Sequence, residues 1–259
     1  MGPFEIVAAL ASGLAIGAIL GLIGGGGSIL AVPLLIYFVG VGSTHMAIGT
    51  AAVAVALNAA TGLVGHARAG TVKWRCAGVF AVAGAIGAAL GAELGKALDG
   101  DKLLALFGVL MIGVGLSLLR KRKGVEAPDV RLTRTNAGYL LPRLVPIGLG
   151  TGLAAGFFGI GGGFLIVPGL IAATAMPLRN AIGTSLVVVT TLGLTTAASY
   201  ALSGLVDWQL TGLLFLGGVA GALVGIALGK LLAARKGMLE KLFAVLVVSV
   251  GGYIIAQSF

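Results

Sequence analysis

The chain has 259 residues, of which 58% are hydrophobic and only 10% are charged, and its mean hydropathy is +1.12. Soluble domains carry about 25% charged residues, so this composition excludes a soluble globular fold. The formal net charge is +9, and the single cysteine, Cys76, excludes an intramolecular disulfide and a cysteine-built metal cluster.

Apolar segments come in two sets of five, separated by a polar stretch. In chain order we expect them at 4–22, 28–40, 45–65, 76–98 and 103–119, and then at 138–157, 164–176, 180–202, 209–232 and 238–257. Most are long enough to cross ~30 Å of hydrocarbon. The sequence therefore predicts an all-α polytopic membrane protein. Its parts are a first repeat (1–119), a basic cytoplasmic linker (120–137) and a second repeat (138–259), which form one integrated membrane domain.

The two halves share sequence motifs at matching places. GLIGGGGSILAVPLL at 21–35 matches GFFGIGGGFLIVPGL at 156–170, and AIGT occurs at 47–50 and again at 181–184. GTVKW at 70–74 matches GLVDW at 204–208. Such repeats at the same spacing are typical of duplicated membrane transporters.

Basic residues predict how the halves are oriented. If the linker and the connections near Arg68 and Arg235 are cytoplasmic, fifteen basic and three acidic residues lie inside, and two basic and five acidic residues lie outside. This follows the positive-inside rule and places both termini outside. GTVKW and GLVDW then lie on opposite sides, which predicts two inverted repeats, each with a glycine-broken helical hairpin and about three spanning helices. The basic excess is thus explained by topology, without nucleic acid.

The glycine runs predict a substrate site. The segments that follow them are about 13 residues long, too short for an ordinary span, so each run is expected to turn a hairpin. Irregular backbone at membrane depth is tolerated where it is buried in protein or lines a water-filled cavity, and helix N-termini bind anions through free N–H groups. The candidates in the two runs are Gly24, Gly25, Gly26, Gly27, Ser28, Gly159, Gly161, Gly162 and Gly163. The alternative is that these glycines only permit close helix crossing.

Polar residues on apolar segments are further candidates for binding the substrate. Thr50, Thr184 and Ser185 stand near the starts of equivalent helices, and Asn58 lies in mid-helix where the second half has Leu192. An amide in the membrane needs a partner and commonly marks function. Other threonines, Thr190, Thr191, Thr195 and Thr196, are expected to bond back to their own helix. Two glycine stripes, at 84–95 and 218–229, are expected to pack helices together.

The chain resembles the sulfite exporter TauE/SafE family. The resemblance rests on the paired Gly-x-x-Gly-Gly-Gly…Pro segments, the AIGT sequences and the duplicated layout of apolar segments. The resemblance covers nearly the whole chain. It implies a secondary transporter of a small sulfur-containing oxyanion, such as sulfite, thiosulfate or a sulfonate, in the inner (cytoplasmic) membrane. Its partners would be that inorganic or organosulfur anion and the lipid bilayer, and a homo-oligomer remains open.

The sequence also argues against other functions. No paired carboxylates, Ser–His–Asp set or metal-ligand spacing occurs, so we expect no enzyme, no cofactor and no metal site. No acidic residue lies in the middle of an expected span, which argues against a carboxylate proton relay. Membrane potential alone would drive export of an anion. The alternatives are a channel-like anion pore and, less favoured, a membrane enzyme or assembly factor.

Overall fold

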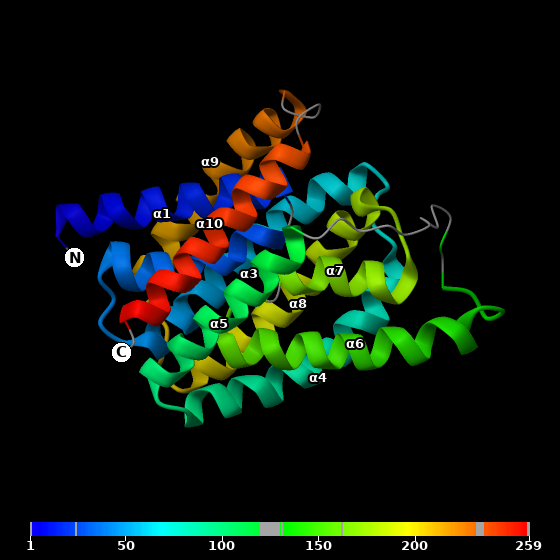
Figure 1. Ribbon diagram of the computed structural model, residues 1–259, viewed down its shortest axis with the longest axis horizontal. Coiled ribbons are helices and arrows are strands. Elements are labelled where there is room, and N and C mark those ends of the chain that lie inside the picture. The colour runs from blue at the N-terminus through cyan, green and yellow to red at the C-terminus, as the bar shows by residue number, and fades with distance from the viewer. Residues whose placement is uncertain are drawn as a thin grey trace.

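The computed structural model describes residues 2–23, 25–119, 130, 132–161, 163–231 and 236–257, and the regular structure in these ranges is entirely helical (Figure 1). Seven of the described helices are long and apolar enough to cross a bilayer. The structure therefore confirms the prediction of an all-α polytopic membrane protein.

The first half contains four long helices and one short irregular segment. In chain order they are α1 (Pro3–Ile23), a segment made of η1 (Gly25–Leu30), α2 (Ala31–Pro33) and η2 (Leu34–Val39), and then α3 (Thr44–Arg68), α4 (Trp74–Ala97) and α5 (Gly100–Leu119). The start of α3 is fixed by Ser43, whose side chain accepts a 3.3 Å hydrogen bond from the backbone N–H of Met46. Such N-caps satisfy one of the free amides of a first helical turn.

The second half repeats this order. It contains α6 (Ala137–Phe158), α7 (Gly163–Thr174), α8 (Leu178–Leu202), α9 (Trp208–Leu231) and α10 (Lys236–Gln257). Asp207 stands immediately before α9, and its carboxylate accepts a 2.9 Å hydrogen bond from the N–H of Leu210. The helix bounds agree with the expected segments to within a few residues, apart from the short segment of the first half.

That short segment differs in form from the single helix expected at 28–40. It begins as a 3₁₀ helix at Gly25, passes through a few α-helical residues and ends as a π-helix at Val39. Pro33 has no backbone N–H to donate to the preceding turn, which weakens a regular helix at this point. Gly25, Gly26 and Gly27 form the first turn of the segment. Mixed helical geometry of this kind is frequent at functional positions.

The helices of the two halves pack on one another reciprocally. The first helix of each half, α1 or α6, packs along the fourth helix of the other half, α9 or α4. The equivalent helices α3 and α8 pack together in the centre, and α5 packs with α10 (Figure 1). This is the pattern expected when two similar halves are related by a two-fold axis.

The glycine stripes bring these helix pairs into close contact. A Cβ atom at Gly87 or Gly91 would overlap the backbone of α6 at Leu149 and Leu153. A Cβ atom at Gly221 or Gly225 would overlap the backbone of α1 in the same way. The stripes therefore pack helices, as the sequence predicted, because small residues let backbones approach in lipid.

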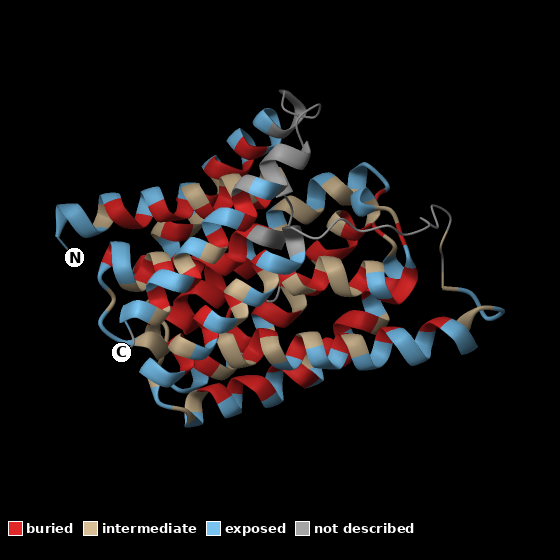
Figure 2. Cartoon of the chain, in the orientation of Figure 1, coloured by how far each residue is buried: buried red, intermediate tan, exposed pale blue. Residues whose placement is uncertain are grey.

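The two ends of the bundle carry different connections. The N- and C-termini lie at one end, which we call the termini end, whereas the chain enters α6 at the opposite end, which we call the linker end (Figure 1). Hence α1 starts at the termini end and α6 starts at the linker end. Buried residues concentrate in the centre, on α3 and α8 and on the helix faces turned towards them (Figure 2).

Candidate substrate-binding site

The two glycine runs meet inside the bundle. The first continues into η1, the second leads into α7, and η1 packs directly against α7. Gly27, Ser28, Gly161 and Gly163 are all buried. Gly24 and Gly162 lie outside the described residues. For Gly25 and Gly26 the structure describes the backbone but not the burial. The packing places the candidate site where equivalent segments of the two halves touch.

The first run is pressed against α1. A Cβ atom at Gly27 would lie 2.8 Å from the backbone nitrogen of Leu20, so no larger residue fits without moving a helix. Ser28 beside it is fully buried. Glycine is therefore required here by close approach of two backbones.

The second run forms a sharp turn between α6 and α7, and this turn packs against the other half. Gly159 and Gly161 have φ angles of 65° and 60°, in the left-handed region that favours glycine. A Cβ atom at Gly161 would lie 3.2 Å from Cγ1 of Val55 and 3.8 Å from Cγ1 of Val189. Val55 and Val189 are equivalent residues of α3 and α8, so Gly161 lies at the junction of the two halves.

The AIGT threonines fasten each half to the other. The N–H of Lys73 donates a 3.0 Å hydrogen bond to Oγ1 of Thr184, and the N–H of Asp207 donates a 3.0 Å hydrogen bond to Oγ1 of Thr50. Both threonines are fully buried. Their hydroxyls are thus engaged as acceptors of bonds across the two halves, a role that the sequence did not predict.

Back-bonding accounts for other hydroxyls. Ser185 Oγ donates 2.8 Å to the carbonyl of Ile182, so this candidate is also engaged within its helix. Thr190, Thr191 and Thr195 donate to carbonyls four residues earlier, at 2.8, 3.0 and 2.9 Å, as expected. Thr196 differs from that expectation, because its Oγ1 is buried without a hydrogen-bond partner.

Asn58 breaks the symmetry of the interior. Its side chain is 2% exposed, and its Oδ1 is buried without a partner. It lies against Gly218 of α9, where a Cβ atom would collide with the amide. At the equivalent place in the other half, Leu192 packs against Gly84, with 2.8 Å between its Cδ1 and the position of a Cβ. One half therefore presents an amide where the other presents a hydrocarbon.

Two further buried hydroxyls without a partner, on Ser12 and Tyr200, were not expected from the sequence. Ser12 Oγ on α1 is buried without a partner. Ser12, Asn58 and Thr196 thus lie on α1, α3 and α8, and each of these helices contacts η1. A serine on an otherwise apolar first helix was the signal available in the sequence, because buried polar groups in membranes are costly unless they are paired.

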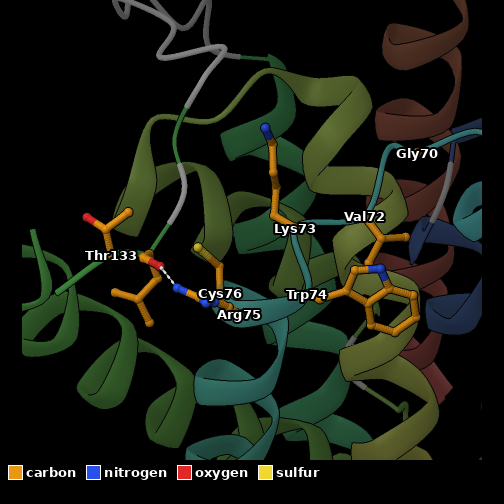
Figure 3. A pocket seen from close by; sticks show the side chains of 8 residues that line it. Gly70, Val72, Lys73, Trp74, Arg75, Cys76 and Thr133 are labelled. Carbon is orange, nitrogen blue, oxygen red and sulfur yellow. Dashed lines mark hydrogen bonds between the residues drawn. The ribbon is translucent and has the colours of Figure 1, made fainter.

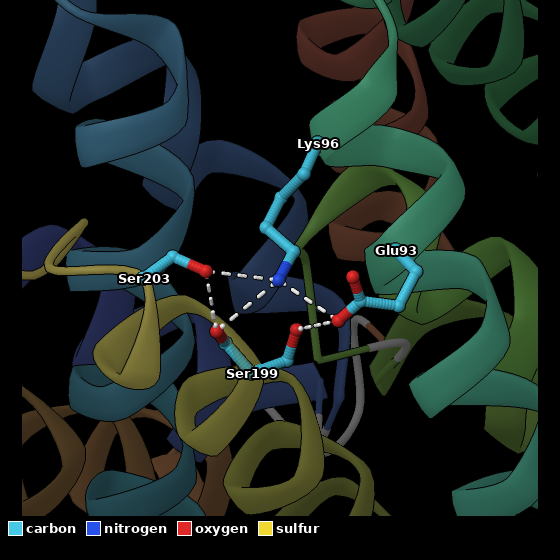
Figure 4. Close-up of polar contacts among 4 residues, drawn as sticks. All are labelled: Glu93, Lys96, Ser199 and Ser203. Atoms are coloured by element: carbon cyan, nitrogen blue, oxygen red, sulfur yellow. Dashed lines mark hydrogen bonds and ion pairs between the residues drawn. The ribbon is translucent and has the colours of Figure 1, made fainter.

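Polar residues at the termini end form a cluster around Lys96. Its Nζ lies 2.8 Å from Glu93 Oε1 and donates 3.0 Å to Ser203 Oγ, while Ser199 Oγ donates 2.8 Å to the same Glu93 oxygen (Figure 4). The cluster joins the last turns of α4 and α8. Within the described ranges no three His, Cys, Asp or Glu side chains gather as ligands for a metal ion.

Comparison with known proteins agrees with this architecture. The profile of the family described as sulfite exporter TauE/SafE matches residues 9–254. The chain belongs to this family. Its relatives include a "Probable membrane transporter protein" of Xylella fastidiosa strain 9a5c, which is 47% identical over 98% of this chain and 97% of the relative.

More distant relatives carry similar names. The "Probable membrane transporter protein YdhB" of Bacillus subtilis is 30% identical over 81% of this chain and 84% of its own length. The "Probable membrane transporter protein YunE" of the same organism is 27% identical over 84% of this chain and 86% of its own length. No solved structure matches the chain. The TauE/SafE protein described here is therefore a multi-pass membrane transporter, and the names of its relatives are those of transporters, not of enzymes.

Proposed function

We propose that this TauE/SafE protein is a secondary transporter that exports a small sulfur-containing oxyanion, such as sulfite, thiosulfate or a sulfonate, across the cytoplasmic membrane. The observation that carries the proposal is the contact between the two glycine-containing segments at the centre, bordered by α1, α3 and α8. Ser12 on α1, Asn58 on α3 and Thr196 on α8 each have a buried polar atom without a hydrogen-bond partner, and His45 on α3 and Tyr200 on α8 each have another.

Unpartnered polar groups in a dry interior favour a polar ligand. A buried polar group without a hydrogen bond costs about 1–3 kcal/mol, and a substrate that supplies the missing partner recovers that energy. The hydroxyls of Ser12 and Thr196 and the amide NH₂ of Asn58 can donate to oxyanion oxygens, whereas the unpartnered Asn58 Oδ1 is an acceptor and pairs only with a protonated form of the anion. Small size follows from the close packing at Gly27 and Gly161, which leaves room for few atoms.

The repeats are proposed to be inverted in the membrane. Support comes from the opposite starting ends of α1 and α6 and from the reciprocal packing of α1 with α9 and of α4 with α6 (Figure 1). Arg68 and Lys73 lie by the connection from α3 to α4 at the linker end, whereas Glu93 and Asp99 lie by the connection from α4 to α5 at the termini end. The positive-inside rule then places the linker end in the cytoplasm.

Membrane potential is the proposed driving force. A cell that is negative inside favours exit of an anion by about 2.3 kcal/mol per charge per 100 mV. A transporter of this kind needs no coupled ion for export, which suits an interior whose polar candidates are hydroxyls and an amide.

A ligand screen tests the substrate class. Purified protein is heated in sulfite, thiosulfate, sulfate, taurine-like sulfonates and carboxylates, and Tm is compared with that in chloride at equal ionic strength. A ligand that binds only the folded state stabilises it by RT ln(1 + [L]/Kd), so Tm rises with ligand concentration. We expect sulfur oxyanions to stabilise the protein and Asn58→Leu to abolish that effect. Stabilisation by cations alone would contradict the proposal.

A further inference from the structure

A second polar site lies at the linker end, away from the glycine runs. A cavity of about 470 Å³ opens there between the start of α4 and the segment 132–133. Its lining residues are Gly70, Val72, Lys73, Trp74, Arg75, Cys76, Leu132 and Thr133. Two of them are basic, and none of these described lining residues is acidic.

One of the two basic side chains, Arg75, is held by a hydrogen bond. Lys73, Arg75 and Cys76 extend from the beginning of α4, and Arg75 points towards the 132–133 segment (Figure 3). Arg75 Nη1 donates a 3.3 Å hydrogen bond to the carbonyl oxygen of Leu132. That oxygen carries no net charge, so the guanidinium keeps its positive charge for a ligand. Guanidinium groups fit tetrahedral oxyanions through paired N–H donors.

The opposite wall is a defined turn with a hydroxyl. The N–H of Thr133 donates 2.8 Å to Oδ1 of Asn136, and Thr133 Oγ1 lies 2.8 Å from Thr135 Oγ1. This turn holds Thr133 at the cavity mouth. A ligand in the cavity would therefore meet the Lys73 ammonium, the Arg75 guanidinium and the Thr133 hydroxyl.

Trp74 places the cavity near the headgroup region of the bilayer. Its side chain is 57% exposed at the first residue of a spanning helix, where tryptophan commonly marks the membrane interface. Basic pockets between transmembrane helices on the cytoplasmic side bind phosphate-bearing headgroups. The equivalent turn of the second half has Asp207 and Gln209 in place of Lys73 and Arg75, and thus lacks the cations.

We propose that this cavity binds a phosphate oxyanion, supplied by an acidic lipid headgroup or by free phosphate. The site also touches the contact between the halves, because the N–H of Lys73 bonds to Thr184. Occupancy would therefore stabilise the junction of α4 with α8. The proposal concerns binding at the linker end and does not depend on the identity of the transported anion.

The test measures Tm of the purified full chain in detergent with added phosphatidylglycerol, phosphatidylcholine or inorganic phosphate. Wild type and the control Arg143→Gln, which removes an exposed basic residue outside the cavity, should be stabilised by phosphatidylglycerol or phosphate, with a Tm that rises logarithmically once the ligand concentration exceeds Kd. In Lys73→Gln/Arg75→Gln the Kd fitted to this dependence should rise about thirtyfold, corresponding to about 1 kcal/mol for each basic residue. Lys73→Arg/Arg75→Lys, which keeps both charges, should retain binding.

The probe that raises Tm distinguishes a lipid headgroup from free phosphate. Stabilisation by phosphatidylglycerol but not by phosphate assigns the site to a lipid, and the reverse assigns it to a soluble anion. Asn58→Leu should bind as wild type does, which separates this site from the proposed transport site. The proposal is overturned if neither probe stabilises wild type, or if Lys73→Gln/Arg75→Gln responds as wild type does.

Discussion

The backbone N–H of Lys73, at the end of one half's GTVKW turn, donates a 3.0 Å hydrogen bond to Thr184 of the other half. The backbone N–H of Asp207, in the equivalent GLVDW turn, donates the matching 3.0 Å bond to Oγ1 of Thr50. Each AIGT sequence thus holds the turn before α4 or α9 in the opposite half. This explains why both motifs are repeated together along the chain.

Removing either threonine hydroxyl should loosen one end of the bundle. Thr50→Val and Thr184→Val keep the side-chain volume but leave the N–H of Asp207 or Lys73 without its partner. Interhelical hydrogen bonds in membranes contribute on average about 0.6 kcal/mol, so each variant should lower Tm modestly. Thr195→Val is the control, because its hydroxyl bonds within its own helix. Equal stability of all three variants would contradict this role.

Substitution at the glycine turn should stop transport. Gly161→Val places a branched side chain at a positive φ angle and against Val55, where a Cβ alone would lie 3.2 Å from Cγ1. The left-handed conformation costs a residue with a Cβ roughly 1–2 kcal/mol. Flux in proteoliposomes should disappear while much of the protein stays folded by size-exclusion chromatography. Gly78→Val, at a site with no neighbour within 4 Å, should transport normally.

Replacing Asn58 should separate stability from function. Asn58→Leu copies the residue of the second half and removes a buried oxygen that lacks a partner. We expect Tm to be unchanged or higher, whereas substrate binding should fall. The reverse change, Leu192→Asn, buries a new amide and should lower stability by about 1–3 kcal/mol. If Asn58→Leu lowers Tm and keeps full transport, Asn58 is a structural residue.

Single cysteines test the inverted arrangement. In a Cys76→Ser background, Arg68→Cys and Leu202→Cys place one thiol each at equivalent, exposed ends of α3 and α8. Inverted repeats predict that an impermeant maleimide labels only Leu202→Cys from outside intact cells, and labels Arg68→Cys after permeabilisation. Labelling of both cysteines from outside would exclude inversion.

Much of the fold could be predicted from the sequence because its signals are local. Long apolar runs defined the helices, and matching motifs at equivalent positions defined the two halves. The irregular helix at 25–39 could not be predicted, because the segment packs against α1 and α7, which are distant or separate elements of the sequence. The packing role of the glycine stripes was predictable, since small residues at helical spacing have few other uses in lipid.

The candidate site was only partly accessible to such reasoning. The sequence identified Asn58 as an isolated amide, but its contact with Gly218 joins residues far apart in the chain. Thr50 and Thr184 were expected near a substrate, and their bonds to the opposite half became visible only in three dimensions. Ser12 and Thr196 differ from other hydroxyls by the absence of a partner, which depends on every neighbouring helix.

The most direct test of the account is anion flux in proteoliposomes under a controlled membrane potential. Sulfite or a sulfonate should leave faster when the compartment facing the linker end is made negative, and the acceleration should grow with substrate charge, by about 2.3 kcal/mol per charge per 100 mV. Competing sulfur oxyanions should reduce the flux, and ammonium or divalent metals should not. Movement of cations without any oxyanion would contradict the account.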